Sequence, residues 1–323
     1  MQADTQLIVL AAPLHGVDKI YDRFYDQIIK FQADFSKIIA NAGDRVLVLA
    51  DHRAEKRLLQ HGVPLEHILL KPMEDIWMRD FTVVEPNNPS QFLYTPQAQD
   101  GKARWARKVQ SAFNTLADKV GLEFRKIPLY LDGGNWVSDG TGKVVVTERF
   151  LKDNRMDHHA GVQAIRHHTG ATQVCILPDD DPDGLGHVDG MVMFLDSSTV
   201  CVNSYPEPLY SQVRHALASA FPGVAIVDLP VEFDDAPIDP RYSSASGIYV
   251  NATVTSRAVY LPQYGLQSDA TAMSLVGRCS RRPVVAVPAE AVCKLGGACR
   301  CLTLQLTGAN AEALLSYAAY KRR

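Results

Sequence analysis

The sequence lacks the long apolar segments and the basic excess that mark membrane and nucleic-acid-binding proteins. Its first apolar run, 7–14, is too short to span a membrane and follows Asp4 rather than a basic segment, so we expect neither a membrane span nor a signal peptide. The 33 lysines and arginines are outnumbered by 36 acidic residues, which gives no reason to expect nucleic acid or an anionic membrane as a partner. We therefore expect a cytoplasmic protein that acts on a small molecule.

Cysteine and the glycine pattern of nucleotide-binding loops are also scarce. Six cysteines spread over 323 residues, without a secretory signal, predict thiols rather than a disulfide framework. No Gly-x-Gly-x-x-Gly loop follows an early strand-like segment, which counts against a dinucleotide-binding fold. The composition, 46% hydrophobic and 21% charged, is instead typical of a globular protein with a sizeable core.

Amphipathic segments recur along the chain, and each predicts a helix. A break containing Gly, Pro or Arg follows each segment, then a short apolar strand, then a polar cluster and sequence typical of further strands. The chain therefore reads as five helix-strand-hairpin modules. Their helices are expected at 17–41, 103–120, 158–169, 209–221 and 268–278.

Modules of this kind cannot bury their apolar faces singly, whereas a closed radial array removes the exposed sheet edges. We therefore predict an α/β fold, a five-bladed α/β propeller with a pseudo-fivefold repeat, in one catalytic domain that spans residues 1–323. The fifth module lacks a return strand, which the N-terminal strand, 6–13, would supply and so close the ring. A doubly wound parallel sheet is the alternative, because alternating strands and helices usually indicate one.

The polar clusters fall at equivalent points of the modules, where the first inner strand begins. In a radial array equivalent points surround the central axis, so the clusters should form one pocket. His187 and Asp189 occupy alternate positions of an expected strand and should therefore point to the same face. The residues at these points are Asp80, Asp132, His187 with Asp189, Asn251 and Cys301.

Cys301 is the candidate nucleophile of this pocket. It follows two glycines, 296–297, that would let a ligand approach the backbone, and a neighbouring cation such as His187 would favour its thiolate. Two carboxylates, Asp80 and Asp189, would match the forked donors of a guanidinium group. A small core cysteine, or a zinc site built from the clustered side chains, are the alternatives.

Six motifs occur in order between Pro72 and Thr303. They are Trp77-Met78-Arg79-Asp80, Gly133-Gly134-Asn135, Thr147-Glu148 with Asn154-Arg155, Gly186-His187-Val188-Asp189, Tyr249-Val250-Asn251, and Gly296-Gly297 through Cys301-Leu302-Thr303. Together they resemble the agmatine deiminase and Porphyromonas-type peptidylarginine deiminase family of the guanidine-modifying (pentein) superfamily.

The resemblance implies a hydrolase with no metal and no organic cofactor. It implies that ammonia leaves a guanidinium substrate through a thiouronium intermediate on cysteine, and that agmatine gives N-carbamoylputrescine. The implied catalytic residues are Cys301 as nucleophile, His187 as acid/base, and Asp80 and Asp189 as guanidinium-binding carboxylates. The implied substrate-binding residues are Asn251, Asp132 and Trp77.

Two departures from the family pattern concern the substrate more than the chemistry. Arg300 precedes the nucleophile where the family usually has His, and no Trp-rich segment precedes the first strand. Peptidyl-arginine or free arginine, which would give citrulline, are therefore alternative substrates. An amidinotransferase and a catalytically weak guanidine-binding protein are alternative functions, and a homodimer is compatible with the resemblance.

Overall fold

The computed structural model describes residues 6–181, 184–232, 238 and 243–322. The strands within these residues are β1 (Leu7–Ala11), β2 (Arg45–Ala50), β3 (Ile68–Leu70), β4 (Ser90–Leu93), β5 (Arg125–Tyr130), β6 (Val137–Ser138), β7 (Lys143–Thr147), β8 (Gln173–Leu177), β9 (Val192–Asp196), β10 (Thr199–Asn203), β11 (Ala225–Leu229), β12 (Thr253–Val254), β13 (Val259–Gln263), β14 (Val284–Pro288) and β15 (Leu304–Leu306). The α-helices are α1 (Lys19–Arg23), α2 (Tyr25–Asn41), α3 (His52–Gln60), α4 (Met78–Phe81), α5 (Ala103–Val120), α6 (Arg149–Asn154), α7 (His158–Thr169), α8 (Leu209–Ala220), α9 (Ser268–Cys279) and α10 (Gly308–Lys321).

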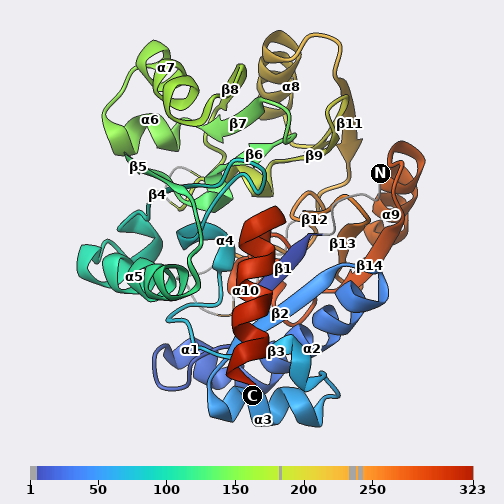
Figure 1. Cartoon of the computed structure of the whole chain (residues 1–323). Coiled ribbons are helices and arrows are strands. Elements are labelled where there is room, and N and C mark those ends of the chain that lie inside the picture. Colours follow the sequence, from blue (N-terminus) through green and yellow to red (C-terminus); the bar gives the residue numbers. More distant parts are fainter. Residues whose placement is uncertain (1–5, 182–183, 233–237, 239–242, 323) are drawn as a thin grey trace.

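The described strands form five sheets around a common centre, with most of the helices outside them (Figure 1). Their spatial orders are β15-β1-β2-β3, β4-β5, β6-β7-β8, β9-β10-β11 and β12-β13-β14. This arrangement confirms the predicted five-bladed α/β propeller and excludes the doubly wound sheet. The chain that follows β2 forms one further helix and strand, α3 and β3, and β3 pairs with β2 at the edge of the first sheet.

Four of the sheets share one pairing pattern. An inner strand pairs antiparallel with a middle strand, and the middle strand pairs parallel with an outer strand. In the remaining sheet an isolated antiparallel bridge between Val84 and Ser90 stands where the inner strand would pair. The first and last strands of the chain meet in one sheet, because β1 pairs with β15.

The helices connect the parallel strands of each sheet. Parallel neighbours need a crossover connection, and a helix supplies it. The strand that follows each helix therefore joins the hairpin that precedes the helix, for example β8 with β6 and β7. The predicted order of elements along the chain is correct. The predicted grouping is shifted, because each sheet combines a hairpin with the strand that follows the next helix, whereas the prediction combined a strand with the hairpin after it.

The helix bounds follow the sequence signals closely. Glycines in the left-handed region end α5 and α7, at Gly121 (φ 76°) and Gly170 (φ 78°), as expected for helix C-termini. The helix expected over 17–41 is instead two helices, because Phe24 has a non-helical backbone (ψ 18°) between α1 and α2.

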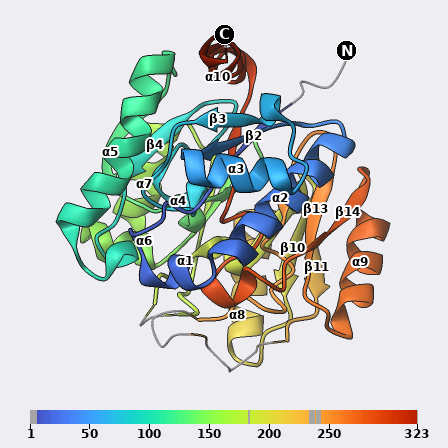
Figure 2. The ribbon, with the colours of Figure 1, turned by 90° about the horizontal axis from the view of Figure 1, so that it is seen from below.

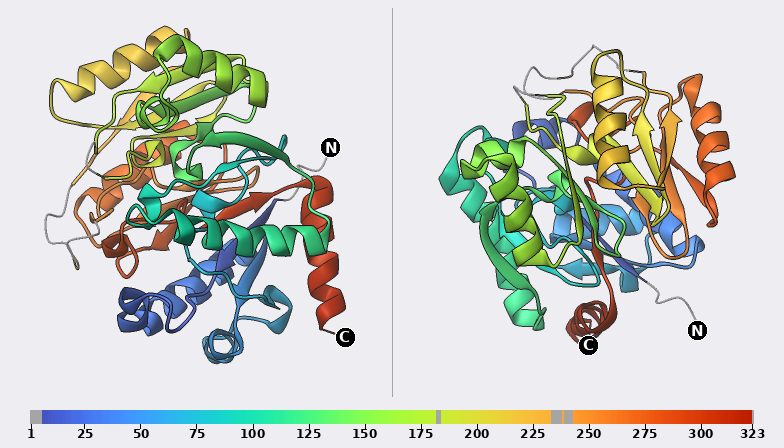
Figure 3. Two further views of the ribbon diagram at one scale, coloured as in Figure 1. Left: turned by 90° about the vertical axis from the view of Figure 1, so that its left-hand side faces the viewer. Right: turned by 90° about the horizontal axis from the view of Figure 1, so that it is seen from above.

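The core lies between the outer helices and the sheets. Helix α8 contacts β8 of the preceding sheet, and α9 contacts both β11 and β14, so helices fill the spaces between neighbouring sheets (Figure 3). Helix α10 packs at the edge of the molecule against α5 and β3 (Figure 2). Of the helices in the described part of the chain, none is long and apolar enough to cross a membrane.

Candidate active site

The predicted site residues lie in short turns that immediately precede the inner strands. Asp80 lies in the single-turn helix α4 rather than in a strand. The prediction that His187 and Asp189 alternate along a strand is wrong, because they flank Val188 in a 3₁₀ turn before β9. The turns bring all of the predicted catalytic residues into one cluster. The buried members and their exposed fractions are Asp80 (8%), Asp132 (4%), Asp189 (1%), Asn251 (3%) and Cys301 (7%).

His187 lies between two carboxylates. Its Nε2 is 3.2 Å from Asp132 Oδ2, and its Nδ1 is 3.8 Å from Asp80 Oδ1. Burial lowers the pKa of His187, but the charge of Asp80 and the hydrogen bond to Asp132 outweigh it and raise the pKa to about 9. His187 is therefore protonated at neutral pH and can act as a proton donor.

Thr95 fixes the carboxylate that holds His187. Its backbone N–H donates to Asp132 Oδ1 and its hydroxyl donates to Asp132 Oδ2, each at 2.8 Å. Asp132 is thus oriented by hydrogen bonds from one residue and turns its Oδ2 atom to the imidazole. Sequence reasoning missed Thr95, since it lies at the end of an ordinary strand-like segment.

Gly134 allows His187 and Asp80 to approach the backbone. Its N–H donates to Asp80 Oδ1 at 2.9 Å. A Cβ atom at this position would overlap His187 Nδ1 and would lie 2.8 Å from Asp80 Oδ1. The glycines of the predicted Gly-Gly-Asn motif therefore have a steric role inside the site.

Cys301 is a free thiol held by Asn251 and next to Asp189. Asn251 Nδ2 donates to the sulfur at 3.1 Å, and Asp189 Oδ2 lies 3.7 Å from it. Asn251 Oδ1 also accepts from the backbone N–H groups of Ala298 (3.1 Å) and Cys301 (3.4 Å), so one amide fixes both the turn and the Cys301 thiol. Burial, followed by the charges of Asp189 and Asp80, raises the thiol pKa well above its usual range.

Trp77 lies beside the same turn. A Cβ atom on Gly297 would come within 2.6 Å of Trp77 Cζ3 and 2.8 Å of Cys301 Cβ, so the glycine lets the indole ring pack close to Cys301. This contact explains why the second of the two predicted glycines has no side chain, and the substrate-binding role of Trp77 stays a prediction.

Two arginines lie near the carboxylates Asp80 and Asp189, which are the guanidinium-binding candidates. Arg300 Nε lies 3.6 Å from Asp189 Oδ2, and the buried Arg79 also favours ionised Asp189. Even so, burial keeps the pKa of Asp189 above its usual range and raises that of Asp80 to about 8. The protein's own cations therefore do not fully stabilise either carboxylate, and a cationic guest would.

Sequence reasoning noted Arg300 only as a departure from the family pattern and gave Arg79 no role. The signal was present in the sequence, because both arginines directly adjoin a catalytic candidate, Asp80 or Cys301. Among the described residues, no three His, Cys, Asp or Glu side chains are arranged to hold a metal ion.

Residues 3–306 match the sequence model of the Porphyromonas-type peptidyl-arginine deiminase family. The chain belongs to this family. A Vibrio parahaemolyticus protein provisionally named as an agmatine deiminase is 22% identical over 88% of the chain and 91% of its own length. A corresponding Selenomonas ruminantium protein is 26% identical over 82% of the chain and 84% of its own length.

The fold is that of solved family structures. The C. jejuni agmatine deiminase superimposes with a TM-score of 0.79 at 15% identity, covering 95% of this chain and 94% of that one. The Enterococcus faecalis agmatine deiminase gives a TM-score of 0.74 at 17% identity, covering 94% of each chain. These similarities confirm the predicted pentein fold.

Proposed function

We propose that this chain is a cysteine-dependent guanidine deiminase that hydrolyses a C–N bond of agmatine and releases ammonia and N-carbamoylputrescine. The supporting observation is the cluster itself. A buried thiol, a protonated imidazole and two buried carboxylates with raised pKa values lie together at one end of the ring. Family membership supports the same reaction class.

Asp80 and Asp189 bind the guanidinium group in this proposal. The planar guanidinium presents paired N–H donors that carboxylates match, and its charge stabilises their ionised forms. Because the pKa of Asp80 is about 8 in the free site, binding at neutral pH releases a proton from this carboxyl. Binding therefore converts Asp80 into the ionised form that holds the substrate.

The bound guanidinium also activates Cys301. In the free site Asp189 and Asp80 raise the thiol pKa, and a cation placed between them offsets that effect. The thiol then loses its proton to solvent, and the sulfur attacks the central guanidinium carbon. As the tetrahedral adduct collapses, His187 gives its proton to one nitrogen, the C–N bond breaks and ammonia leaves.

Hydrolysis of the thiouronium returns the enzyme to its first state. His187, now neutral, takes a proton from water, and the oxygen attacks the same carbon. The C–S bond breaks as the new hydroxyl group loses its proton, and that proton restores the Cys301 thiol while the product carries a neutral ureido group. The ammonia released earlier takes up the proton that the thiol first gave to solvent, so the net reaction turns a guanidinium ion and water into a ureido product and ammonium.

Agmatine is preferred because its distal end is a cation. Burial raises the pKa of Asp153 although the charge of Arg149 opposes the increase, so this carboxyl would gain from a second nearby cation such as an ammonium. Arg149, a candidate partner for a substrate carboxylate, is already engaged by Gly184 O and lies 3.5 Å from Asp179 Oδ2. Free arginine and peptidyl-arginine, whose product is citrulline, are the alternatives.

A substrate panel tests the proposal. Purified protein is given agmatine, arginine and arginine-ended peptides, and ammonia and ureido product are measured with wild type, Cys301→Ala and the control Cys279→Ala. We expect agmatine to give both products, Cys301→Ala to abolish them and Cys279→Ala to leave them unchanged. Turnover by Cys301→Ala at the wild-type rate would refute the assignment of the nucleophile.

The same assay separates the competing functions. Transfer of the amidino group to an added amine would identify an amidinotransferase, and saturable agmatine binding without turnover would identify a guanidine-binding protein. Loss of activity in chelator, restored by zinc, would favour a metal site. The cytoplasmic location and the homodimer stay predictions, and sedimentation of the purified protein tests the second.

A further inference from the structure

A cavity of about 240 Å³ lies at the end of the ring opposite the catalytic cluster. The catalytic residues precede the inner strands, whereas the cavity is lined by residues at the far ends of the same strands. These lining segments include 137–140 around the end of β6, 193–196 in β9, 254–256 around the end of β12, and Gln305 in β15. We call this space the rear cavity.

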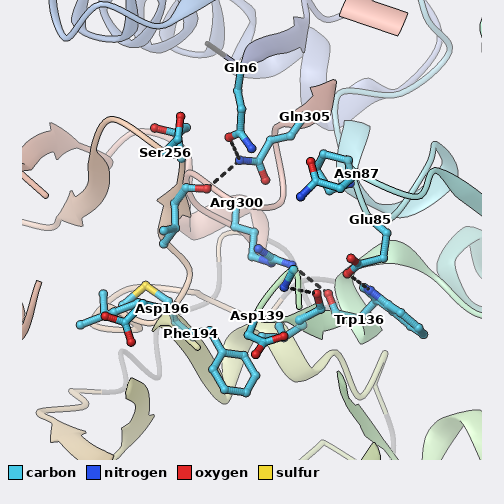
Figure 4. Close-up of a pocket in the computed structure, with 18 of the residues that line it drawn as sticks. Gln6, Glu85, Asn87, Trp136, Asp139, Phe194, Asp196, Ser256, Arg300 and Gln305 are labelled. Carbon is cyan, nitrogen blue, oxygen red and sulfur yellow. Dashed lines mark hydrogen bonds between the residues drawn. The ribbon is translucent and has the colours of Figure 1, made fainter. Parts of the chain in front are cut away.

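Two arginines, Arg300 and Arg79, line the rear cavity. Arg300 Nη2 donates to Trp136 O at 2.8 Å, and Figure 4 shows its guanidinium group among the labelled lining residues. Arg79, only 3% exposed, donates from Nη2 to Gln305 Oε1 at 3.1 Å. The Nε atoms of both arginines are buried, and that of Arg300 lies 3.6 Å from Asp189 Oδ2, so a guest in the cavity would meet the terminal nitrogens of the guanidinium groups.

The acidic side chains of the lining are already supplied with donors. Glu85 accepts from the Trp136 indole N–H at 2.9 Å. Asp139 accepts from the ammonium of Lys143 at 2.9 Å and from the Thr141 backbone and hydroxyl. Asp196, the third acidic residue, accepts from the backbone N–H and the hydroxyl of Ser198, at 2.8 and 2.7 Å. Each acidic side chain of the lining therefore already has a hydrogen-bond donor within the protein, which weakens its attraction for a cationic guest.

The two positively charged guanidinium groups at the inner end of the cavity favour an anionic guest. Burial, followed by the charge of Arg300, lowers the pKa of Arg79 to about 9. The carboxylates on the catalytic side, Asp189 and Asp80, act against this decrease without cancelling it. A negatively charged guest in the rear cavity would stabilise both guanidinium groups in their charged form.

We propose that the rear cavity binds a small oxyanion of the phosphate or carboxylate class, with Arg300 and Arg79 as its main ligands. Guanidinium groups donate paired, coplanar N–H groups that match the oxygens of such anions. The proposal does not require the deiminase reaction, because neither arginine takes part in its chemical steps, although Arg300 also neighbours Asp189.

Direct titration tests the proposal on the free protein. Inorganic phosphate and acetate are titrated at constant ionic strength by calorimetry, with chloride as the reference anion. We expect saturable binding of at least one of the two oxyanions, and the stronger one identifies the class. Arg300→Gln should weaken that binding by roughly tenfold or more, since it removes the charge-assisted donors. Arg300→Lys, which keeps only the charge, should weaken it less.

A second set of variants avoids the buried arginines, whose replacement could disturb folding. Asn87 lines the cavity and is exposed, so substitutions there leave the core intact. Asn87→Asp should weaken oxyanion binding and Asn87→Lys should strengthen it, each by about two- to fivefold at low salt, whereas Asn87→Gln should change nothing.

Two further measurements decide where the anion binds. Saturating agmatine should not compete with phosphate or acetate for Cys301→Ala, because the two sites lie at opposite ends of the ring. If agmatine proves not to bind, the titrations of the free protein still decide the question. Absence of saturable binding of either oxyanion, or binding that ignores the charge at positions 87 and 300, would overturn the proposal.

Discussion

Neutralising Asp132 should move the whole pH profile of the enzyme to lower pH. Asp132 acts on two titrating groups: its hydrogen bond and charge raise the pKa of His187, and its charge raises the pKa of Asp80. The proposed reaction needs His187 protonated and Asp80 ionised. In Asp132→Asn both pKa values should fall, so both limbs of the profile should move in the same direction.

The size of the movement follows from the lost hydrogen bond. The pKa of His187 is about 9 against an ordinary value of 6.5. A hydrogen bond to a charged group is worth about 1.5–3 kcal/mol and a neutral one roughly 1. The difference, at about 1.4 kcal/mol for each pH unit, lowers the pKa of His187 by about one. Asp80 remains 3.8 Å away and should keep it above its ordinary value.

The assay is kcat/KM for ammonia release, which reports the ionisations of the free enzyme. Rates at low agmatine concentration between about pH 6 and pH 10 define both limbs. We expect the wild-type rate to fall as pH rises through about 9, where His187 loses its proton, and the Asp132→Asn rate to fall about one pH unit earlier. Asp118→Asn, on the exposed side of α5, is the matched control and should keep the wild-type profile.

Thr95→Val separates position from charge. It removes the hydroxyl that orients Asp132 but keeps the carboxylate charge, so its profile should move less than that of Asp132→Asn. The reasoning is refuted if folded Asp132→Asn keeps the wild-type alkaline limb, or if that limb moves to higher pH. Either result would mean that Asp132 does not hold the proton on His187.

Two further predictions concern other parts of the site. Asp80→Asn and Asp189→Asn should each lower kcat/KM more than about tenfold, because a neutral partner replaces a charge-assisted one; unaltered kinetics in both would make the carboxylates structural. The pKa of Asp80 is raised from 3.8 to about 8 on folding, so its ionisation costs stability as pH rises through this range, and calorimetry should find Asp80→Asn increasingly stabilised relative to wild type. Gly134→Ala should abolish turnover and lower Tm, since its Cβ would overlap the His187 ring, whereas Gly190→Ala should be tolerated because none of the described atoms lies within 4 Å of the added Cβ. Equal activity of the two alanine variants would contradict the steric role of Gly134.

The sequence predicted the outer architecture better than the local geometry of the site. Helices α5 and α7 have the predicted bounds because an apolar stripe and a C-terminal glycine both mark them. The turns before the inner strands carry no comparable periodicity. His187 and Asp189 therefore suggested a strand, although a 3₁₀ turn places them in the site. Their convergence followed from the repeat of the modules and not from the assumed strand.

Partners from distant modules could not be predicted residue by residue. Thr95 orients Asp132 across 37 positions of sequence, and Asn251 holds Cys301 across 50. Such pairs depend on how neighbouring blades meet, which a pattern within one module does not encode. Arg300 shows the same limit, since its place beside the nucleophile is visible in the sequence but its pairing with Asp189 is not.

Asp80 and Asp189, the two guanidinium-binding candidates, have cationic neighbours that respond differently to pH. Asp80 faces His187, whose charge disappears as pH rises through about 9, whereas Asp189 faces Arg300, whose guanidinium group stays charged across the same range. Above that pH Asp80 loses its internal cation and depends on the substrate alone, but Asp189 does not. An imidazole in place of Arg300 could lose its charge as well. The arginine therefore gives Asp189 a cationic neighbour that does not depend on the protonation of a histidine.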